Sequence, residues 1–125
     1  MKHSSTPLLF FFLLIAASLQ CNKHDKQFCN EQRTTALALY ERGGTVVYSH
    51  KHKRYAIRID TTIVGNIDTE IIGFPCSLSR KLSHSGERVV LIGELKNFNM
   101  QEEMKPDLGG QELYFLEIAS IEAQP

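Results

Sequence analysis

The sequence lacks an excess of charge of either sign. Its 14 Lys and Arg residues match 14 Asp and Glu residues, so the formal net charge at pH 7 is zero. Residues 1–20 hold only one of these charges, Lys2, so a chain beginning at Cys21 keeps 13 basic against 14 acidic side chains. Such a balance supplies no global field to attract a polyanion. We therefore do not expect nucleic acid as a partner.

The sequence also lacks the short motifs of common enzymes. It has no Gly-x-Ser-x-Gly elbow, no His-Glu-x-x-His motif and no glycine-rich phosphate loop. Ser83-His84-Ser85 has residue types suited to acyl transfer, but no carboxylate is evidently placed to orient His84. The paired carboxylates Asp60 with Asp68, and Glu102-Glu103, lie on polar loops where charges are usually solvated. We predict a protein that is not an enzyme and has no cofactor, with an envelope hydrolase using His84 as an alternative.

The apolar run near the N-terminus is too short to span a bilayer. Leu8 to Ala17 carries no charge and follows a short basic start containing Lys2. A spanning helix needs about 20 such residues, whereas this length and these flanks are typical of a secretory signal. We expect residues 1–20 to be a signal peptide that is removed. Cleavage after Ser18, which would give a soluble secreted protein, is the alternative.

Cysteine is scarce, with three residues in the chain. In an exported protein, a disulfide between Cys29 and Cys76 leaves Cys21 over, and an odd cysteine requires an explanation. The pair is 47 positions apart. Closing a loop of that length stabilises a small domain by about 4 kcal/mol on the chain-entropy model. We predict this disulfide, with two unpaired buried thiols as the alternative.

Cys21 is then the candidate for lipid attachment. Ser18-Leu19-Gln20-Cys21 resembles the lipobox of bacterial lipoproteins, although Ser18 and Gln20 depart from its usual leucine and small residue. The resemblance implies a diacylglycerol thioether on Cys21, usually with an acylated amino group. Asn22 to Gln27 is a polar stretch without apolar periodicity, so we interpret residues 21–28 as a lipidated tether, followed by one domain at 29–125. The expected location is the cell membrane or outer membrane, with the domain facing the periplasm or the cell surface.

The apolar pattern of the domain has a period of two more often than of 3.6, which indicates strands. The interval Glu31 to Arg42 also admits a helix, and Gly43-Gly44 suggests a bulge or bend in a long first strand. Ser77 to Leu82 is the one predicted helical turn, with Leu78 and Leu82 on one face. The predicted strands cover residues 37–48, 55–60, 67–74, 88–95 and 112–121.

Two of the predicted strands carry further local signals. Tyr55, Ile57 and Ile59 alternate with Arg58 and Asp60, so the apolar and the charged side chains lie on opposite faces of the strand. Pro75 follows residues 67–74 and cannot donate to a central ladder, so we expect it to mark the end of that strand.

Five strands with a short helix between the third and fourth form the element order of an OB-fold barrel. Gly44 to Tyr48, Phe74-Pro75, Gly86 to Gly93 and Gly110 to Glu112 resemble segments of single-domain OB-like lipoproteins of unknown function from Gram-negative bacteria. The resemblance implies a mainly β, five-stranded OB-like barrel and an envelope location, and it implies no activity. A small antiparallel β sandwich is the alternative fold.

One predicted hairpin tip concentrates positive charge. It contains two histidines and three fixed cations: His50, Lys51, His52, Lys53 and Arg54. His50 and His52 have the spacing of two metal ligands, but two ligands do not make a site and the cations repel a divalent metal. We predict no metal site and regard the tip as a candidate contact for an anionic ligand. The resulting hypothesis is a non-catalytic binding or assembly module whose partner is an envelope protein or an anionic envelope ligand. A soluble secreted OB-fold binder of glycan or nucleic acid is its alternative.

Overall fold

The computed structural model describes residues 28–61, 69–99, 104–106 and 109–125. The chain divides into two units, Met1–Gln32 and Arg33–Pro125, and all five strands belong to the second. In the first unit, residues 28–30 are helical. The predicted signal peptide, Cys21 and the tether up to residue 27 lie outside the described residues.

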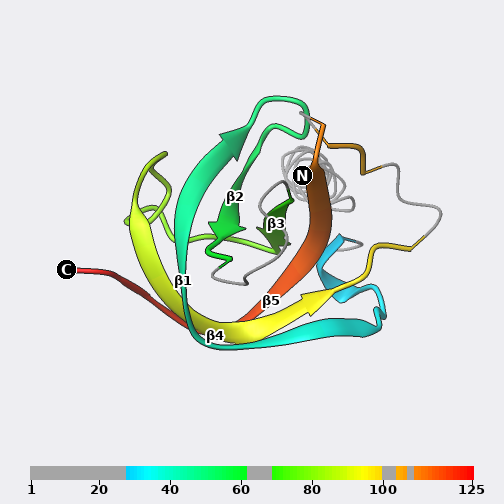
Figure 1. Cartoon of the computed structure of the whole chain (residues 1–125), viewed down its shortest axis with the longest axis horizontal. Coiled ribbons are helices and arrows are strands. Elements are labelled where there is room, and N and C mark those ends of the chain that lie inside the picture. Colours follow the sequence, from blue (N-terminus) through cyan, green and yellow to red (C-terminus); the bar gives the residue numbers. More distant parts are fainter. Residues whose placement is uncertain (1–27, 62–68, 100–103, 107–108) are drawn as a thin grey trace, which may run out of the picture. The chain divides into compact units, whose positions relative to one another are not determined.

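The second unit is a closed barrel of five strands (Figure 1). Around the barrel the order is β1-β2-β3-β5-β4, with β3 and β5 parallel and the other neighbours antiparallel. This arrangement confirms the predicted small five-stranded barrel over the alternative sandwich. The strands are β1 (Thr35–Ser49), β2 (Arg54–Ile59), β3 (Glu70–Pro75), β4 (Arg88–Lys96) and β5 (Gln111–Ala123).

The long strand β1 closes the barrel because it pairs with two neighbours. Its first part pairs with β4 and its last part, from Gly44, pairs with β2. The predicted irregularity lies earlier than Gly43-Gly44, since the register with β4 shifts between Leu39 and Arg42, and Glu41 has a φ of 46°. Gly44 instead allows β1 to lie close to the side chain of Ile57 on β2, because a Cβ on Gly44 would be 2.7 Å from that side chain. The helix considered for residues 31–42 is wrong from Thr35 onward.

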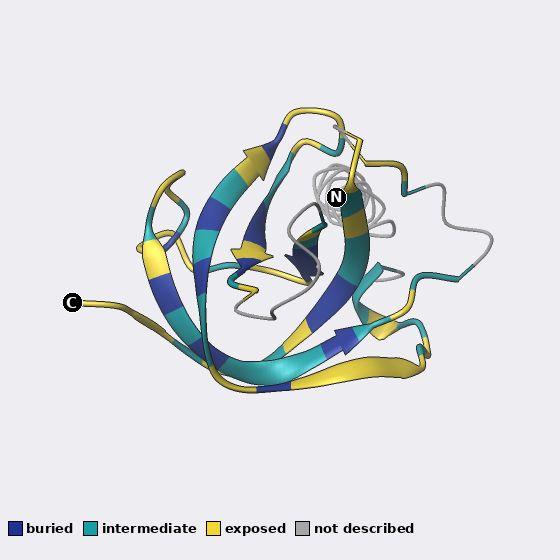
Figure 2. Cartoon of the chain, in the orientation of Figure 1, coloured by how far each residue is buried: buried dark blue, intermediate teal, exposed yellow. Residues whose placement is uncertain are grey.

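The core follows from the alternation of side chains along each strand. Figure 2 shows buried bands separated by exposed or intermediate ones along β1 and β4. On β2, Ile57 and Ile59 are buried in the core and Tyr55 packs against it, while Arg58 is exposed, as the sequence predicted. The core cluster consists of Leu39, Val46, Ile57, Ile59, Leu82, Val89, Leu91, Leu95 and Leu116.

The predicted helical turn between β3 and β4 is not a helix. Residues 76–87 form bends and turns, with hydrogen bonds from the Leu82 amide to Ser79 and from the Ser83 amide to Arg80. Three-residue spacings of this kind close single turns and do not propagate an α-helix. The apolar contacts were nevertheless predicted correctly, because Leu82 belongs to the core and Leu78 packs against it.

Cys29 and Cys76 form the predicted disulfide. Pro75, which lacks a donor for a central ladder, is the last residue of β3, as expected from its chemistry. Within the described ranges, no helix is both long enough and apolar enough to cross a membrane.

Candidate functional site

A hollow of about 460 Å³ lies on the barrel where β1, β2, β3 and β5 come together. We call it the His52 pocket. Its volume falls within the range of about 300–1,000 Å³ that is usual for small-molecule sites. It is lined by Val47, Tyr48, Ser49, His50, His52, Arg58, Glu70, Ile72, Phe74, Gln111 and Leu113.

The strand register places the floor of this pocket on the outside of the barrel. Arg58 pairs with Ile72, and Ile72 pairs with Leu113, so these three side chains share one face of the sheet. The neighbouring Gly73 faces the core, since a Cβ there would meet the Leu116 and Leu95 side chains at 3.0 to 3.3 Å. Phe74 must then point outward. The floor is therefore apolar and belongs to rigid strands.

His52 stands at one end of the floor and links two loops. Its ring lies edge-on to Phe74, with 5.4 Å between ring centroids. Its Nε2 is 2.7 Å from the backbone oxygen of Lys105, and because a carbonyl oxygen only accepts, the imidazole donates this hydrogen bond through its Nε2–H. The His52 amide donates to the Ser49 hydroxyl at 3.3 Å. These contacts connect the β1–β2 turn to the segment before β5.

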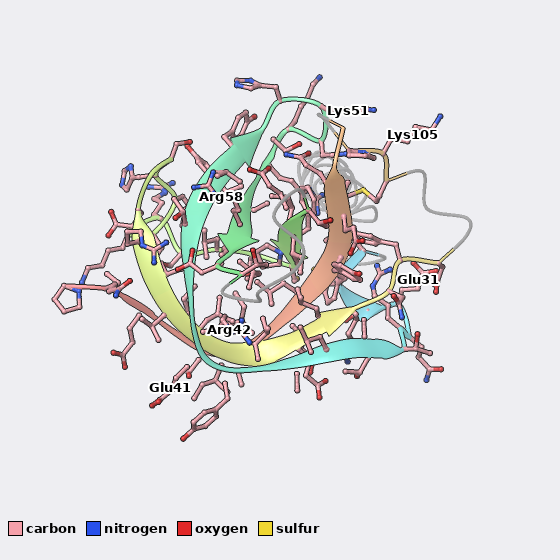
Figure 3. All side chains as sticks on the ribbon, in the orientation of Figure 1. Glu31, Glu41, Arg42, Lys51, Arg58 and Lys105 are labelled. Carbon is pink, nitrogen blue, oxygen red and sulfur yellow. The ribbon has the colours of Figure 1, made fainter. Side chains whose placement is uncertain are left out.

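The structure divides the predicted basic tip into two parts. His50 and His52 line the pocket, whereas Lys51, Lys53 and Arg54 are not among the lining residues. Lys53 adopts a φ of 53° in the turn. Figure 3 shows Lys51 near Lys105 at the same end of the barrel. The cations thus lie near the pocket's end and leave its floor to apolar side chains.

Tyr48 forms an aromatic cluster beside the histidines. Its ring meets His50 and Tyr55 edge-on, with centroids 5.1 and 5.0 Å apart. It is 38% exposed, whereas Tyr55 packs against the core. Of the two tyrosines in this cluster, only Tyr48 lines the pocket.

The end of the pocket opposite His52 contains two charged side chains, Arg58 and Glu70. The side-chain amide of Gln111 donates to the Glu70 carboxylate at 3.0 Å. The backbone N–H of Glu70 donates to the backbone carbonyl of Gly110 at 2.9 Å. Arg58, on β2, is labelled in Figure 3 beside the β1–β2 pair. Arg58 and Glu70 make no ion pair with each other, although they belong to neighbouring strands. The pocket therefore combines an apolar floor with one positive and one negative group.

Next to Arg58, an ion pair holds the end of β2. Arg88 donates to both oxygens of the Asp60 carboxylate, at 2.9 and 2.5 Å, and also to the Thr45 hydroxyl at 2.7 Å. The hydrogen bond from Arg88 is the main cause that lowers the pKa of Asp60, and the charges of Arg58 and Arg42 add to it. Because Asp60 already accepts both Arg88 bonds, its carboxylate is committed to Arg88.

The predicted catalytic candidates are not assembled into a site. The Ser83 hydroxyl donates to the Ser79 carbonyl at 2.8 Å, which ties it to its own turn, and His84 is exposed. Asp68 and Glu102-Glu103 lie outside the described residues. Among the residues that are described, no group of three or more His, Cys, Asp or Glu side chains is placed to hold a metal ion.

A second hollow, of about 440 Å³, lies against β1, β4 and β5. We call it the Tyr40 groove. Lys96 reaches both carboxylates of its rim: it lies 3.9 Å from Glu94 and forms an ion pair with Glu117. The groove is lined by Ala38, Leu39, Tyr40, Ile92, Gly93, Glu94, Glu117 and Ala119.

Sequence reasoning identified one end of the His52 pocket and missed the rest. Alternation along β2 placed Arg58 on the face away from the core, but nothing marked it as a ligand contact. Ile72, Phe74 and Leu113 read as ordinary strand residues. The available signal was a run of apolar residues on both faces of β3, Ile71-Ile72-Gly73-Phe74, which indicates a strand covered on its outer side as well.

Comparison with models of known protein families gives no match, and no curated protein matches the sequence. The functional argument therefore depends on the geometry of the barrel and on the sequence.

Proposed function

We propose that this protein is a non-catalytic binding module of the bacterial cell envelope, held at a membrane through Cys21, and that it takes its ligand in the His52 pocket. The observation that carries the proposal is the pocket itself. It joins an apolar floor to a few polar groups at its two ends, which is the usual composition of a small-molecule site.

The position of the pocket suits a preformed binding site. Its floor residues belong to β3 and β5, whose parallel pairing runs from Glu70 with Gln111 to Pro75 with Leu116. Rigid strands suit a preformed site. In barrels of this topology, ligands commonly bind the face of strands 2 and 3 and the adjoining loops, although fold-level analogy alone is a weak warrant.

The envelope location depends on the sequence. A signal segment followed directly by Cys21, with Cys29 and Cys76 joined to each other, leaves Cys21 available for acylation. Intact-mass analysis of the membrane-extracted protein tests this directly. We expect a chain that begins at Cys21 and carries acyl chains. A chain that begins at Leu19 without acyl chains would contradict the anchor.

A pocket-filling variant tests the binding proposal. In Leu113→Trp, the indole ring would occupy the pocket. Native mass spectrometry of the full chain should then show loss of any small molecule that co-purifies with the wild type. Ala119→Trp adds the same ring to the Tyr40 groove and serves as the matched control. Binding that survives Leu113→Trp and disappears in Ala119→Trp would place the ligand in the groove and contradict the proposal.

A further inference from the structure

The charged end of the His52 pocket holds two groups of opposite sign that do not neutralise each other. Arg58 pairs with Ile72 in the β2–β3 register, and Glu70 lies two residues before Ile72 on β3, so its side chain is on the same face. Diagonal neighbours of this kind have Cα atoms about 7–8 Å apart, which is within reach of long side chains. The two side chains line one pocket and make no ion pair.

Each of the two groups keeps hydrogen-bonding capacity. Asp60, whose pKa the charge of Arg58 helps to lower, already accepts two hydrogen bonds from Arg88. Among the described residues, no hydrogen bond or ion pair is found for the Arg58 guanidinium, which offers five N–H donors. Glu70 accepts one bond, from Gln111, while a carboxylate has about four lone-pair positions. The pocket therefore presents a donor fork and an acceptor from adjacent strands.

The floor of the pocket is apolar and adds no fixed charge. Ile72 and Phe74 are 5% and 1% exposed, and Leu113 completes the floor beside them. The cations of the turn, Lys51 and Lys53, are not among the lining residues. Apart from the histidines, the lining thus has one positive and one negative charge, and an anion bound at Arg58 would have the Glu70 carboxylate close to it. A ligand that carries both signs matches this lining better than a simple anion does.

From these contacts we infer that the His52 pocket recognises a small apolar zwitterion, with its carboxylate at Arg58, its ammonium at Glu70 and its apolar groups over Ile72, Phe74 and Leu113. The chemical class is an apolar amino acid or a dipeptide of such residues. Gln111 fixes the Glu70 carboxylate through the 3.0 Å hydrogen bond and so acts as a positioning residue. This inference rests on the proposed function, because it names the ligand class of the same pocket.

Leucyl-phenylalanine is the probe, used in four forms: free, N-acetylated, C-amidated and blocked at both ends. Calorimetric titration of the full chain in a neutral maltoside detergent should give the tightest binding for the free form. Blocking either end should weaken binding about tenfold or more, as expected for loss of a hydrogen bond to a charged group. Equal affinity for the free and the doubly blocked forms would overturn the inference.

Two variants assign the ends of the ligand. Arg58→Gln should weaken the free dipeptide about tenfold or more and leave the C-amidated form unchanged, because that form has no carboxylate for Arg58 to bind. Glu70→Gln should weaken the free dipeptide similarly and leave the N-acetylated form unchanged. Arg80→Gln and Glu122→Gln remove the same charges away from the pocket, and both should bind like the wild type. A loss of affinity that is the same for all four forms would contradict the assigned roles.

The two proposals fail in different ways. If no form of the dipeptide binds while Leu113→Trp still removes a co-purified ligand, the zwitterion inference is wrong and the binding function stands. If no form binds and Leu113→Trp changes nothing, both proposals are wrong.

Discussion

The barrel has two hollows of similar volume, about 460 Å³ for the His52 pocket and about 440 Å³ for the Tyr40 groove. They differ in what lines them. The pocket has a buried aromatic residue, Phe74, in its floor and keeps Arg58 and Glu70 apart, whereas the groove exposes 76% of Tyr40 and joins its rim carboxylates through Lys96. Because the two hollows are similar in volume, volume alone does not identify a ligand site. The pocket differs from the groove because Arg58 and Glu70, which make no ion pair with each other, lie beside a buried apolar floor.

The largest expected effect on the free energy of unfolding comes from replacing the aromatic residues of the two hollows, Phe74 and Tyr40. Phe74→Ala removes a side chain that is 1% exposed, and we expect it to lower the free energy of unfolding by about 3–5 kcal/mol. Tyr40→Ala removes a mostly exposed ring and should cost less than about 0.5 kcal/mol. Urea unfolding of both variants measures the difference. Equal losses would show that the floor of the pocket is no better packed than the groove.

The next effect concerns the backbone beneath the groove. A Cβ on Gly93 would collide with the backbone oxygen of Glu117 on β5, so Gly93→Ala must push β4 and β5 apart. We expect a loss of about 1–3 kcal/mol, which is typical of overpacking. Gly109→Ala is the matched control, because no atom lies within 4 Å of its added Cβ. A thermal melt that shows similar stability for both variants would contradict the close approach of the two strands.

The smallest effect concerns the ion pair beside the pocket. Because Arg88 lowers the pKa of Asp60 in the folded state, the unfolded chain binds this proton more readily. The resulting stabilisation is complete above the unfolded pKa, about 3.9, and is lost as pH falls through the lower folded value. Asp60→Asn should therefore be less stable than the wild type at pH 7, with a difference that shrinks as pH falls below about 4.

Denaturant unfolding of both proteins from pH 7 to pH 2 measures this change. Glu122→Gln controls for the general effect of removing one negative charge. A gap between the wild type and Asp60→Asn that stays constant across this range would show that the ion pair does not stabilise the fold.

Much of the fold could be predicted because it depends on local alternation. Tyr55, Ile57 and Ile59 were assigned to the core side of β2, and Pro75 to the end of β3, from single-strand patterns. The bulge was misplaced because the register shift between Leu39 and Arg42 depends on how β1 pairs with β4. The turn at 77–82 was misjudged because the spacing of Leu78 and Leu82 reports burial, which a non-helical segment also satisfies.

The candidate site was harder to predict because its members come from four strands. His50 and His52 drew notice through their local charge, yet Arg58 and Glu70 become neighbours only through the β2–β3 register. Sequence spacing carries no record of that pairing. The face of the sheet on which Phe74 lies was also ambiguous, because a buried apolar residue can belong to the outer face of a strand or to the core.

We propose that the ligand binds in the His52 pocket and not in the Tyr40 groove. Hydrogen exchange of the full chain, measured in native membranes and again after purification and removal of bound small molecules, tests it most directly. We predict that residues 50–53 and 109–111 are more protected in native membranes, while residues 37–41 exchange equally in both states. Protection confined to residues 37–41 would contradict the claim.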